Sequence, residues 1–259
     1  MTRTAAAGVT VLSALIIVAV AAPWLAATDP FAVAGPALAG PTWAHPFGTD
    51  DLGRDVYAGV VHGAATSLRV GFAAALCSTL IGLAVGGVAG MRSGVPDQVA
   101  MRATEFVQAI PRFFLVVMVV SLFGGRVWII VLVIALTAWP ATARVFRAQV
   151  MSTVARDFIL AARAAGSGDA AILVRHVLPV TIAVVAAQVS YQVGGAILAE
   201  AGLSFLGLGD PTTISWGTLL GTASHSAREA WWIAVFPGLA VTLTVLGCNL
   251  LADSLVRRD

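Results

Sequence analysis

The stretch RDFILAARAAGSGDAAILVRHVLP, residues 156–179, interrupts the apolar second half of the chain. Its ionisable side chains are Arg156, Asp157, Arg163, Asp169, Arg175 and His176. Charges at this density cannot lie in hydrocarbon, yet alanines recur through the stretch at helical spacing. A pair of short helices, broken at Gly166 and Gly168 and lying in water at one membrane face, satisfies both properties. The stretch is either a functional loop or an ordinary helical hairpin.

The first of these predicted helices carries a stripe of small and apolar side chains. Phe158, Ile159, Ala162 and Ala165 recur at the spacing of one helix face. Such a face is flat enough for the backbone of another protein to approach closely. If the loop is functional, this stripe is its predicted docking surface.

The composition indicates a polytopic membrane protein. Of the 259 residues, 59% are hydrophobic and 11% are charged, whereas an average soluble domain has about 25% charged residues. A water-soluble fold would lack the polar surface to cover so many apolar side chains. We therefore predict an all-α polytopic membrane protein.

Arginine supplies all fifteen basic residues, because the chain contains no lysine. A Walker A loop needs its lysine on the nucleotide phosphates, and Schiff-base chemistry needs a lysine amine. Any ATP and Mg²⁺ used by this protein must therefore be bound by partner subunits. No cofactor and no nucleic-acid partner are expected for this chain.

Metal-binding and disulfide patterns are also missing from the sequence. The histidines are His45, His62, His176 and His225. No two of them have metal-ligand spacing, so no metal site is expected. Cys77 and Cys248 lie in apolar runs, where we expect small buried side chains rather than a disulfide.

Six apolar stretches predict membrane-spanning helices of about 20 residues each. They cover residues 4–28, 70–90, 103–123, 127–143, 177–199 and 230–252. A cleaved signal peptide is the alternative for the first, because Arg3, an apolar region and small residues near Ala21 fit it loosely. The length of the run and Trp24 favour a retained helix.

Two of these spans carry features that predict packing. The second contains Gly82, Gly86 and Gly90, a repeat of small residues that lets helix backbones approach closely. In the third, Glu105 and Arg112 are seven residues apart, which predicts a shared helix face near the membrane boundary.

Residues 29–65 form a polar connection that contains HPFGTDDLGRD. Its turn-forming residues include Pro46, Gly48, Asp50 and Gly53. Turn formers at this density predict an ordered loop rather than a linker. We expect a structural role for it in preference to a ligand-binding one.

Glu200 is predicted to end the fifth span, beside a helix break that begins at Gly202. A carboxylate at membrane depth is costly unless it is paired. We therefore expect Glu200 to be a structural helix-end carboxylate, hydrogen-bonded to backbone groups of the following loop or to a partner helix, and not a cargo ligand.

The placement of arginines predicts the orientation in the membrane. With the N-terminus inside, the cytoplasmic arginines are Arg3, Arg92, Arg102, Arg144, Arg147, Arg156, Arg163, Arg175, Arg257 and Arg258. The outer side keeps Arg54, Arg69, Arg126 and Arg228. The positive-inside rule favours this arrangement, with both termini and residues 156–179 in the cytoplasm.

Three sequence strings resemble one family of transporters. Ala161 and Ala162, then Gly166, then Leu178 and Pro179, resemble the "EAA" loop in inner-membrane subunits of binding-protein-dependent ABC importers. HPFGTDDLGRD is similar to the HPLGTDxLGRD signature of the dipeptide, oligopeptide and nickel branch of that family. LAEAGLSFLGLG, followed by SWG, resembles the same branch.

The resemblance implies a role for the loop at residues 155–179. In that family the loop forms a coupling helix that docks in a cleft of the ATPase subunit. The residues to which this role carries over are Phe158, Ala161, Ala162, Gly166, His176, Leu178 and Pro179. The family's leading glutamate is Leu160 here, which implies docking by apolar fit more than by a salt bridge.

The resemblance also implies a type I ABC importer permease fold in the bacterial inner membrane. Residues 1–64 would form an N-terminal transmembrane helix and an extracytoplasmic loop, residues 65–254 the permease core, and residues 255–259 a cytoplasmic tail. The implied partners are a second, homologous permease subunit, two cytoplasmic ATPase subunits or domains, an extracytoplasmic solute-binding protein and the lipid bilayer. Alternating access would carry peptides, with nickel chelates or haem-like ligands as the alternative cargo.

Two other functional classes are weighed against this one. Ser224, His225 and Ser226 form a Ser/His cluster, but they lack a Gly-x-Ser-x-Gly setting, so no catalytic residue is predicted. A self-sufficient secondary transporter would show paired broken helices and midplane ionisable groups. Uptake measured with and without a co-purified ATPase separates that class from an ABC permease.

Overall fold

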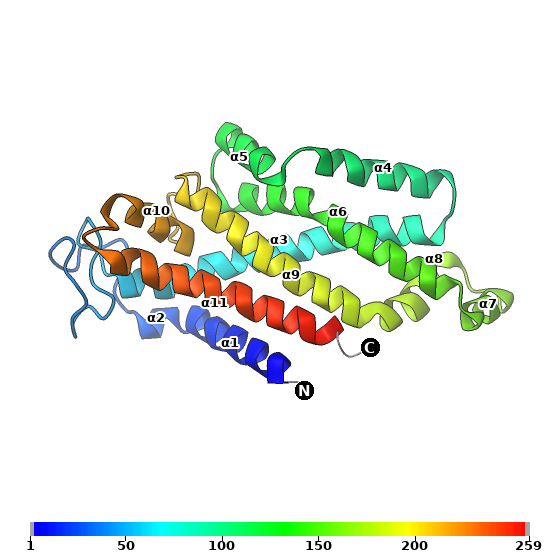
Figure 1. Ribbon diagram of the computed structural model, residues 1–259, viewed down its shortest axis with the longest axis horizontal. Helices are drawn as coiled ribbons and strands as arrows, with labels where there is room; N and C mark the ends of the chain where they lie inside the picture. The colour runs from blue at the N-terminus through cyan, green and yellow to red at the C-terminus, as the bar shows by residue number, and fades with distance from the viewer. Residues whose placement is uncertain (1–2, 257–259) are drawn as a thin grey trace.

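The computed structural model describes residues 3–256, most of which lie in helices (Figure 1). The longer helices are α1 (Arg3–Val20), α3 (Val56–Met91), α4 (Val95–Ala109), α5 (Arg112–Phe123), α6 (Val127–Val154), α9 (Leu178–Phe205), α10 (Trp216–Ser226) and α11 (Trp231–Val256). The shorter ones are α2 (Ala22–Leu25), α7 (Asp157–Ala164), α8 (Asp169–Ile172) and the π-helical segment η1 (Leu173–Val177). Arg257 and Arg258, predicted to be cytoplasmic, lie outside the described residues.

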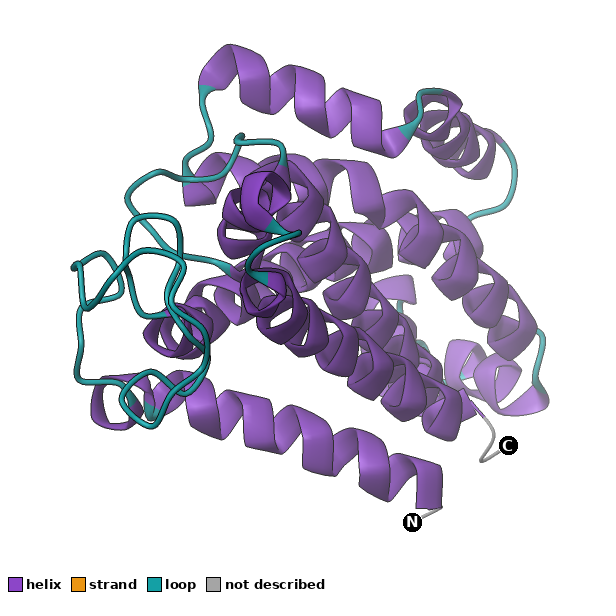
Figure 2. Ribbon diagram, turned by 60° about the vertical axis from the view of Figure 1, so that its left-hand side comes forward, coloured by secondary structure: helices purple, strands orange, loops and turns teal. Residues whose placement is uncertain are grey.

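The helices form an elongated bundle in which α3 has a central position. It packs along α6 and along α9, while α11 packs against α9 and α1. Figure 2 shows α1 along one flank and several loops gathered at one side of the bundle. One apolar cluster includes Ile197 and Trp216, between α9 and α10. Another includes Val120 and Ile130, between α5 and α6.

Four helical stretches are long and apolar enough to cross a membrane: α3, α6, residues 169–205 and α11. The pair α4 and α5 makes a fifth if it counts as one span, although its two helices are bent by 75°. Thr4–Val20 is an apolar helix of shorter length. These helices confirm the predicted all-α membrane class, and the count of six spans stays a prediction.

Several predicted helix boundaries are wrong. The first predicted span, residues 4–28, is α1 followed after Ala21 by the separate α2. α3 begins at Val56, inside the predicted polar connection, because Asp55 caps it: its Oδ1 accepts a hydrogen bond from the N–H of Tyr57 at 2.8 Å. α6 and α9 run on to Val154 and Phe205. A helix keeps its backbone hydrogen bonds when it leaves the apolar layer, so the end of an apolar run does not mark its end.

The predicted third span is two helices rather than one. Pro111 lies between α4 and α5, and the preceding Ile110 is extended, with φ −94° and ψ 130°, because proline disfavours helical backbone before it. The break puts Glu105 and Arg112 on different helices, so their predicted shared face is wrong. Glu105 instead lies 3.3 Å from exposed Arg102. The Nε and Nη2 atoms of Arg112 are buried without a hydrogen-bond partner among the described residues.

The predicted glycine seam on α3 is confirmed. Its residues are Gly82, Gly86 and Gly90, and all three face α6. A Cβ atom at Gly86 would overlap the backbone of Ala143, and one at Gly90 would lie 2.6 Å from the Cβ of Val150. α3 and α6 therefore approach at a distance that only glycine permits on α3.

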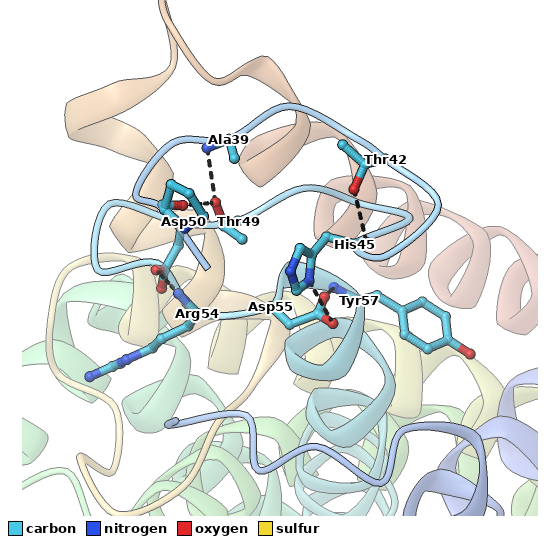
Figure 3. A network of polar contacts seen from close by, with 9 residues as sticks. Ala39, Thr42, His45, Thr49, Asp50, Arg54, Asp55 and Tyr57 are labelled. Atoms are coloured by element: carbon cyan, nitrogen blue, oxygen red, sulfur yellow. Dashed lines mark hydrogen bonds and ion pairs between the residues drawn. The ribbon is translucent and has the colours of Figure 1, made fainter. Parts of the chain in front are cut away.

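The connection from α2 to α3, residues 26–55, is called the long loop here, and Figure 3 shows its polar contacts. Thr49 is fully buried in it. Its Oγ1 accepts from the N–H of Ala39 at 2.9 Å and donates to the carbonyl of Pro36 at 2.6 Å. The carbonyl of Thr49 accepts from Nε1 of Trp232 at 3.1 Å. The long loop is thus fastened to the first turn of α11.

Two carboxylates order the last part of the long loop (Figure 3). Oδ1 of Asp50 accepts from the N–H groups of Leu52 at 2.9 Å and Arg54 at 2.8 Å. Burial raises the pKa of Asp50, and these backbone hydrogen bonds oppose that rise. Nδ1 of His45 lies 3.5 Å from Oδ2 of Asp55. The contacts of HPFGTDDLGRD support the structural role expected for it.

Candidate functional site

The loop at residues 155–179 projects from the end of the bundle opposite to the long loop (Figure 1). It consists of α7, a turn, α8 and η1, and η1 continues directly into α9. The predicted break at Gly166 and Gly168 is confirmed, but only α7 is a separate short helix, because α8 and η1 are the start of one helical stretch that covers residues 169–205. α6 on one side and α9 on the other hold the two ends of the 155–179 loop.

The turn after α7 depends on one glycine. Gly166 has φ +86°, a conformation that L side chains rarely adopt. Its N–H donates to the carbonyl of Arg163 at 2.9 Å, and the N–H of Ser167 donates to the carbonyl of Ala162 at 3.0 Å. This pair of bonds is the Schellman arrangement that ends helices. A Cβ on Gly166 would meet nothing within 4 Å, so only its backbone conformation requires glycine.

Fully buried apolar side chains attach the 155–179 loop to the bundle. Ile159 of α7, Ile172 of α8 and Val177 of η1 pack in one cluster with Phe146 and Val150 of α6. The predicted docking stripe is therefore wrong at Ile159, which faces inward. Because this root is apolar and closely packed, a displacement of α7 must move the neighbouring end of α6.

The opposite side of α7 faces solvent and retains apolar residues. Phe158 is 43% exposed and Leu160 is 57% exposed. Ala161 is also exposed, while Ala162 is partly buried. Nη2 of Arg163 lies 3.6 Å from Oδ1 of Asp169, the first residue of α8, and this ion pair links the two helices across the turn. This exposed apolar surface at the tip of the molecule is suited to contact with another protein.

The remaining residues predicted for the site lie beside η1. The ring of His176 is 6.4 Å from the ring of Phe158, centroid to centroid. Leu178 begins α9 and is partly buried, and Pro179 follows it in an exposed position. Pro179 lies inside the continuous helical stretch of residues 169–205, where it cannot donate a backbone hydrogen bond, and the wider π-helical turn η1 directly precedes it.

Glu200 lies inside α9, five residues before Phe205, and is not a helix-end carboxylate. It is buried, and its Oε1 accepts from Oγ of Ser204 at 2.7 Å. Its Oε2 accepts from Oγ of Ser67 in α3 at 3.3 Å. Oγ of Ser67 also accepts from the N–H of Trp216 at 3.2 Å. Of the two partners that we expected for Glu200, the structure shows the second, a neighbouring helix: side-chain hydroxyls of α3 and of α9 itself satisfy the carboxylate, and the cluster joins α9, α3 and α10.

Replacing Glu200 with alanine is expected to destabilise the protein by about 1–3 kcal/mol, because two buried hydroxyls lose their acceptor. Glu200→Gln keeps one acceptor oxygen and should cost less. Thermal unfolding in detergent measures both effects. Uptake of each peptide tested should fall only in proportion to the loss of folded protein. If Glu200→Gln assembled normally but selectively lost the uptake of one peptide, Glu200 would be a residue that recognises the cargo.

The other reactive residues do not form a site. The hydroxyl of Ser224 donates to the carbonyl of Gly221 at 2.7 Å and not to the imidazole of His225. Within residues 3–256, no group of three His, Cys, Asp or Glu side chains is placed to hold a metal ion. Cys248 is buried, as expected, but Cys77 is exposed, because it faces outward from α3.

One contact was not predicted from the sequence. Arg147 of α6 donates two hydrogen bonds to the carboxylate of Asp97 at the start of α4. The signal in the sequence was weak, because an aspartate and an arginine fifty residues apart do not predict each other as partners.

The fold and its loop define a class: a helical protein with several membrane spans and a projecting two-helix loop rooted on two of them. The sequence profile described as "Binding-protein-dependent transport system inner membrane component" matches residues 82–258. The chain belongs to this family.

Relatives and a solved structure agree with this assignment. A protein named putative peptide permease from Brucella suis is 38% identical over 218 residues, which are 83% of this chain and 72% of that protein. The di/tripeptide transport system permease protein DppC of Pseudomonas aeruginosa is 36% identical and covers 93% of this chain and 82% of its own length. An inward-facing structure of the MetNI methionine ABC transporter has a TM-score of 0.61 and 18% identity, and covers 77% of this chain and 95% of that one. This likeness shows a shared permease fold.

Proposed function

We propose that this chain is a permease subunit of an ATP-driven ABC importer that carries di- and oligopeptides. The observation that carries the proposal is the 155–179 loop: it presents an exposed apolar face at one tip and is rooted by buried side chains on α6 and α9. The relatives are named peptide and di/tripeptide permeases, which favours peptides over nickel chelates as the cargo.

The proposed complex contains further subunits. The chain pairs with a second, homologous permease. Two ATPase subunits or domains complete the complex on one membrane face, one of them in contact with the 155–179 loop, and a solute-binding protein delivers the peptide. Both termini and the 155–179 loop lie in the cytoplasm, and the long loop lies outside. The distribution of arginines supports this orientation. The chain itself has no catalytic role and binds no cofactor, because ATP and Mg²⁺ belong to the ATPases.

Transport follows from alternating access. Closure of the ATPases around ATP displaces α7, and the apolar root passes that displacement to α6 and α9. These helices carry buried contacts with α3, so they shift as packed units rather than bending independently. The shift closes the path on one side and opens it on the other.

Reconstitution in proteoliposomes tests this function. The complex is purified by an affinity tag on this chain. It should take up a labelled dipeptide when ATP is present on the side of the membrane that the ATPases face and loaded binding protein is present on the opposite side. Uptake should stop without ATP. Uptake driven by an ion gradient in the absence of the ATPase would instead make the protein a secondary transporter, and nickel-chelate uptake without peptide uptake would refute the cargo class.

A further inference from the structure

A pair of ionic hydrogen bonds joins α4 to α6. Nε and Nη2 of Arg147 donate to Oδ1 and Oδ2 of Asp97, each at 2.5 Å. The two side chains are 27% and 18% exposed, so the contact is only partly shielded from water. A bidentate bond between arginine and a carboxylate fixes the orientation of its partners as well as their distance.

α4 packs on α3 and α6 with few buried side chains, and a short connection, residues 92–94, joins its start to α3. Among its fifteen residues, all of which the structure describes, Thr104 alone is buried. Val95, Val99 and Phe106 are exposed. The C-terminal end of α4 meets the 75° bend before Pro111. The bend gives α4 a pivot, and the bond to α6 holds the end of α4 that is farther from this pivot.

Arg147 belongs to the part of α6 that supports the 155–179 loop. It follows Phe146 directly and lies one helical turn before Val150, and both of these side chains pack with Ile159 of α7. The carbonyl of Arg147 would lie 2.9 Å from a Cβ at Gly90, so α3 also packs closely here. A movement of α7 therefore reaches the backbone of Arg147 through a short chain of packed groups.

We propose that the Asp97–Arg147 pair is a transmission contact, which makes the broken helix pair α4–α5 follow the 155–179 loop during each transport cycle. The inference rests on the proposed function, because an ATPase must move the loop. α6 carries both the root of the loop and the guanidinium group, and the bidentate bond passes the movement of α6 to α4. Without the pair, α7 and α6 still move, but α4 does not follow, and ATP is hydrolysed without a matching passage of peptide.

Charge exchange tests the pair in the reconstituted complex. Asp97→Ala and Arg147→Ala are each expected to lower peptide uptake per ATP hydrolysed by about tenfold, within the usual range of coupling between sites. The double variant Asp97→Arg with Arg147→Asp should recover most of the loss. Glu105→Ala is the matched control, because it removes an exposed ion pair on the same helix and should change nothing. If the single variants lower assembly, hydrolysis and uptake in equal proportion, the pair is merely structural and the proposal is overturned.

A distance measurement tests the same contact without any cargo. Spin labels replace exposed Val99 on α4 and exposed Leu80 on α3, in protein with Cys77→Ser and Cys248→Ser. α3 and α6 move together, because they are closely packed, so α4 keeps its distance from α3 only if it follows α6. Trapping ADP and vanadate in the ATPases should therefore leave this distance unchanged in the complex with the pair intact, and should change it in Asp97→Ala. The same result in both would overturn the proposal. Failure of peptide uptake by the unaltered complex would refute the proposed function instead, since the distance measurement uses no peptide.

Discussion

Gly166→Val is expected to abolish most ATP-driven peptide uptake while the protein still inserts in the membrane. Gly166 holds φ +86°, and a β-branched side chain is strained there by about 1–3 kcal/mol. Relief of that strain turns the chain out of the Schellman arrangement, so α7 leaves the turn at a different angle. A penalty of this size lowers the fraction of protein molecules whose loop can dock on the ATPase by roughly 5–150-fold. Uptake and the stimulation of ATP hydrolysis by loaded binding protein, both in proteoliposomes, measure the effect.

Gly168→Val is the matched control for that experiment. Gly168 lies two residues further along the same turn, has φ −76° and ψ 162°, and leaves open space for a Cβ. Valine adopts this extended conformation readily. Uptake by Gly168→Val should therefore stay close to that of the unaltered protein. Normal uptake and stimulation in Gly166→Val would remove the coupling role assigned to the 155–179 loop.

Gly86→Ala is expected to cost about 1–3 kcal/mol or more, although it adds only one methyl group. That methyl would overlap the backbone of Ala143 in α6, and backbone cannot move aside as a flexible side chain can. Alanine is favoured over glycine in a helix by about 1 kcal/mol. The steric overlap must therefore cost more than this gain for Gly86→Ala to lower the free energy of unfolding. Thermal unfolding in detergent and the yield of monodisperse complex measure the result.

Gly195→Ala provides the opposite case. Gly195 lies in α9, and a Cβ there would meet nothing within 4 Å. The same substitution should therefore leave stability unchanged or raise it by about 1 kcal/mol, because only the helix preference remains. Equal stability of Gly86→Ala and Gly195→Ala would contradict the close approach of α3 and α6.

Local patterns in the sequence predicted the parts of the molecule that local chemistry decides. The break between α7 and α8 follows from glycines at Gly166 and Gly168 within a charged stretch, and the seam on α3 follows from a four-residue glycine repeat. Both features depend on residues that lie within one or two helical turns. The structure confirmed both, while the docking role of the 155–179 loop stays a proposal.

Contacts between distant segments could not be predicted in this way. Glu200 was expected to bond the following loop or a partner helix, but the sequence did not say which helix: one of its partners is Ser67 of α3, 133 residues away. The bond between Asp97 and Arg147 was not predicted for the same reason, because the two residues are far apart in the sequence. A single sequence states which groups need partners, and only the packing of α3, α4, α6 and α9 decides which groups supply them.

Helix ends were misplaced where polarity was taken as the end of helical structure. α6 continues past its apolar run because its backbone hydrogen bonds persist outside the apolar layer, and α3 begins early because Asp55 caps it. At Pro111 the opposite error occurred: the residues on both sides are apolar enough to suggest one span, but the helix breaks there. Hydropathy follows the environment of a segment, whereas caps and prolines decide where its helices start and stop.

The bond from Trp232 to Thr49 has a consequence for the order in which the chain is completed. The two residues are 183 positions apart, so the ribosome makes the long loop well before it makes α11. Apolar packing between the two segments, including Leu38 and Phe47 with Trp232 and Ile233, also waits for that last helix. The long loop can therefore close against the bundle only after α11 has been inserted. Its closure marks a finished subunit, and a stalled or shortened chain would leave it unprotected for quality-control proteases to cut.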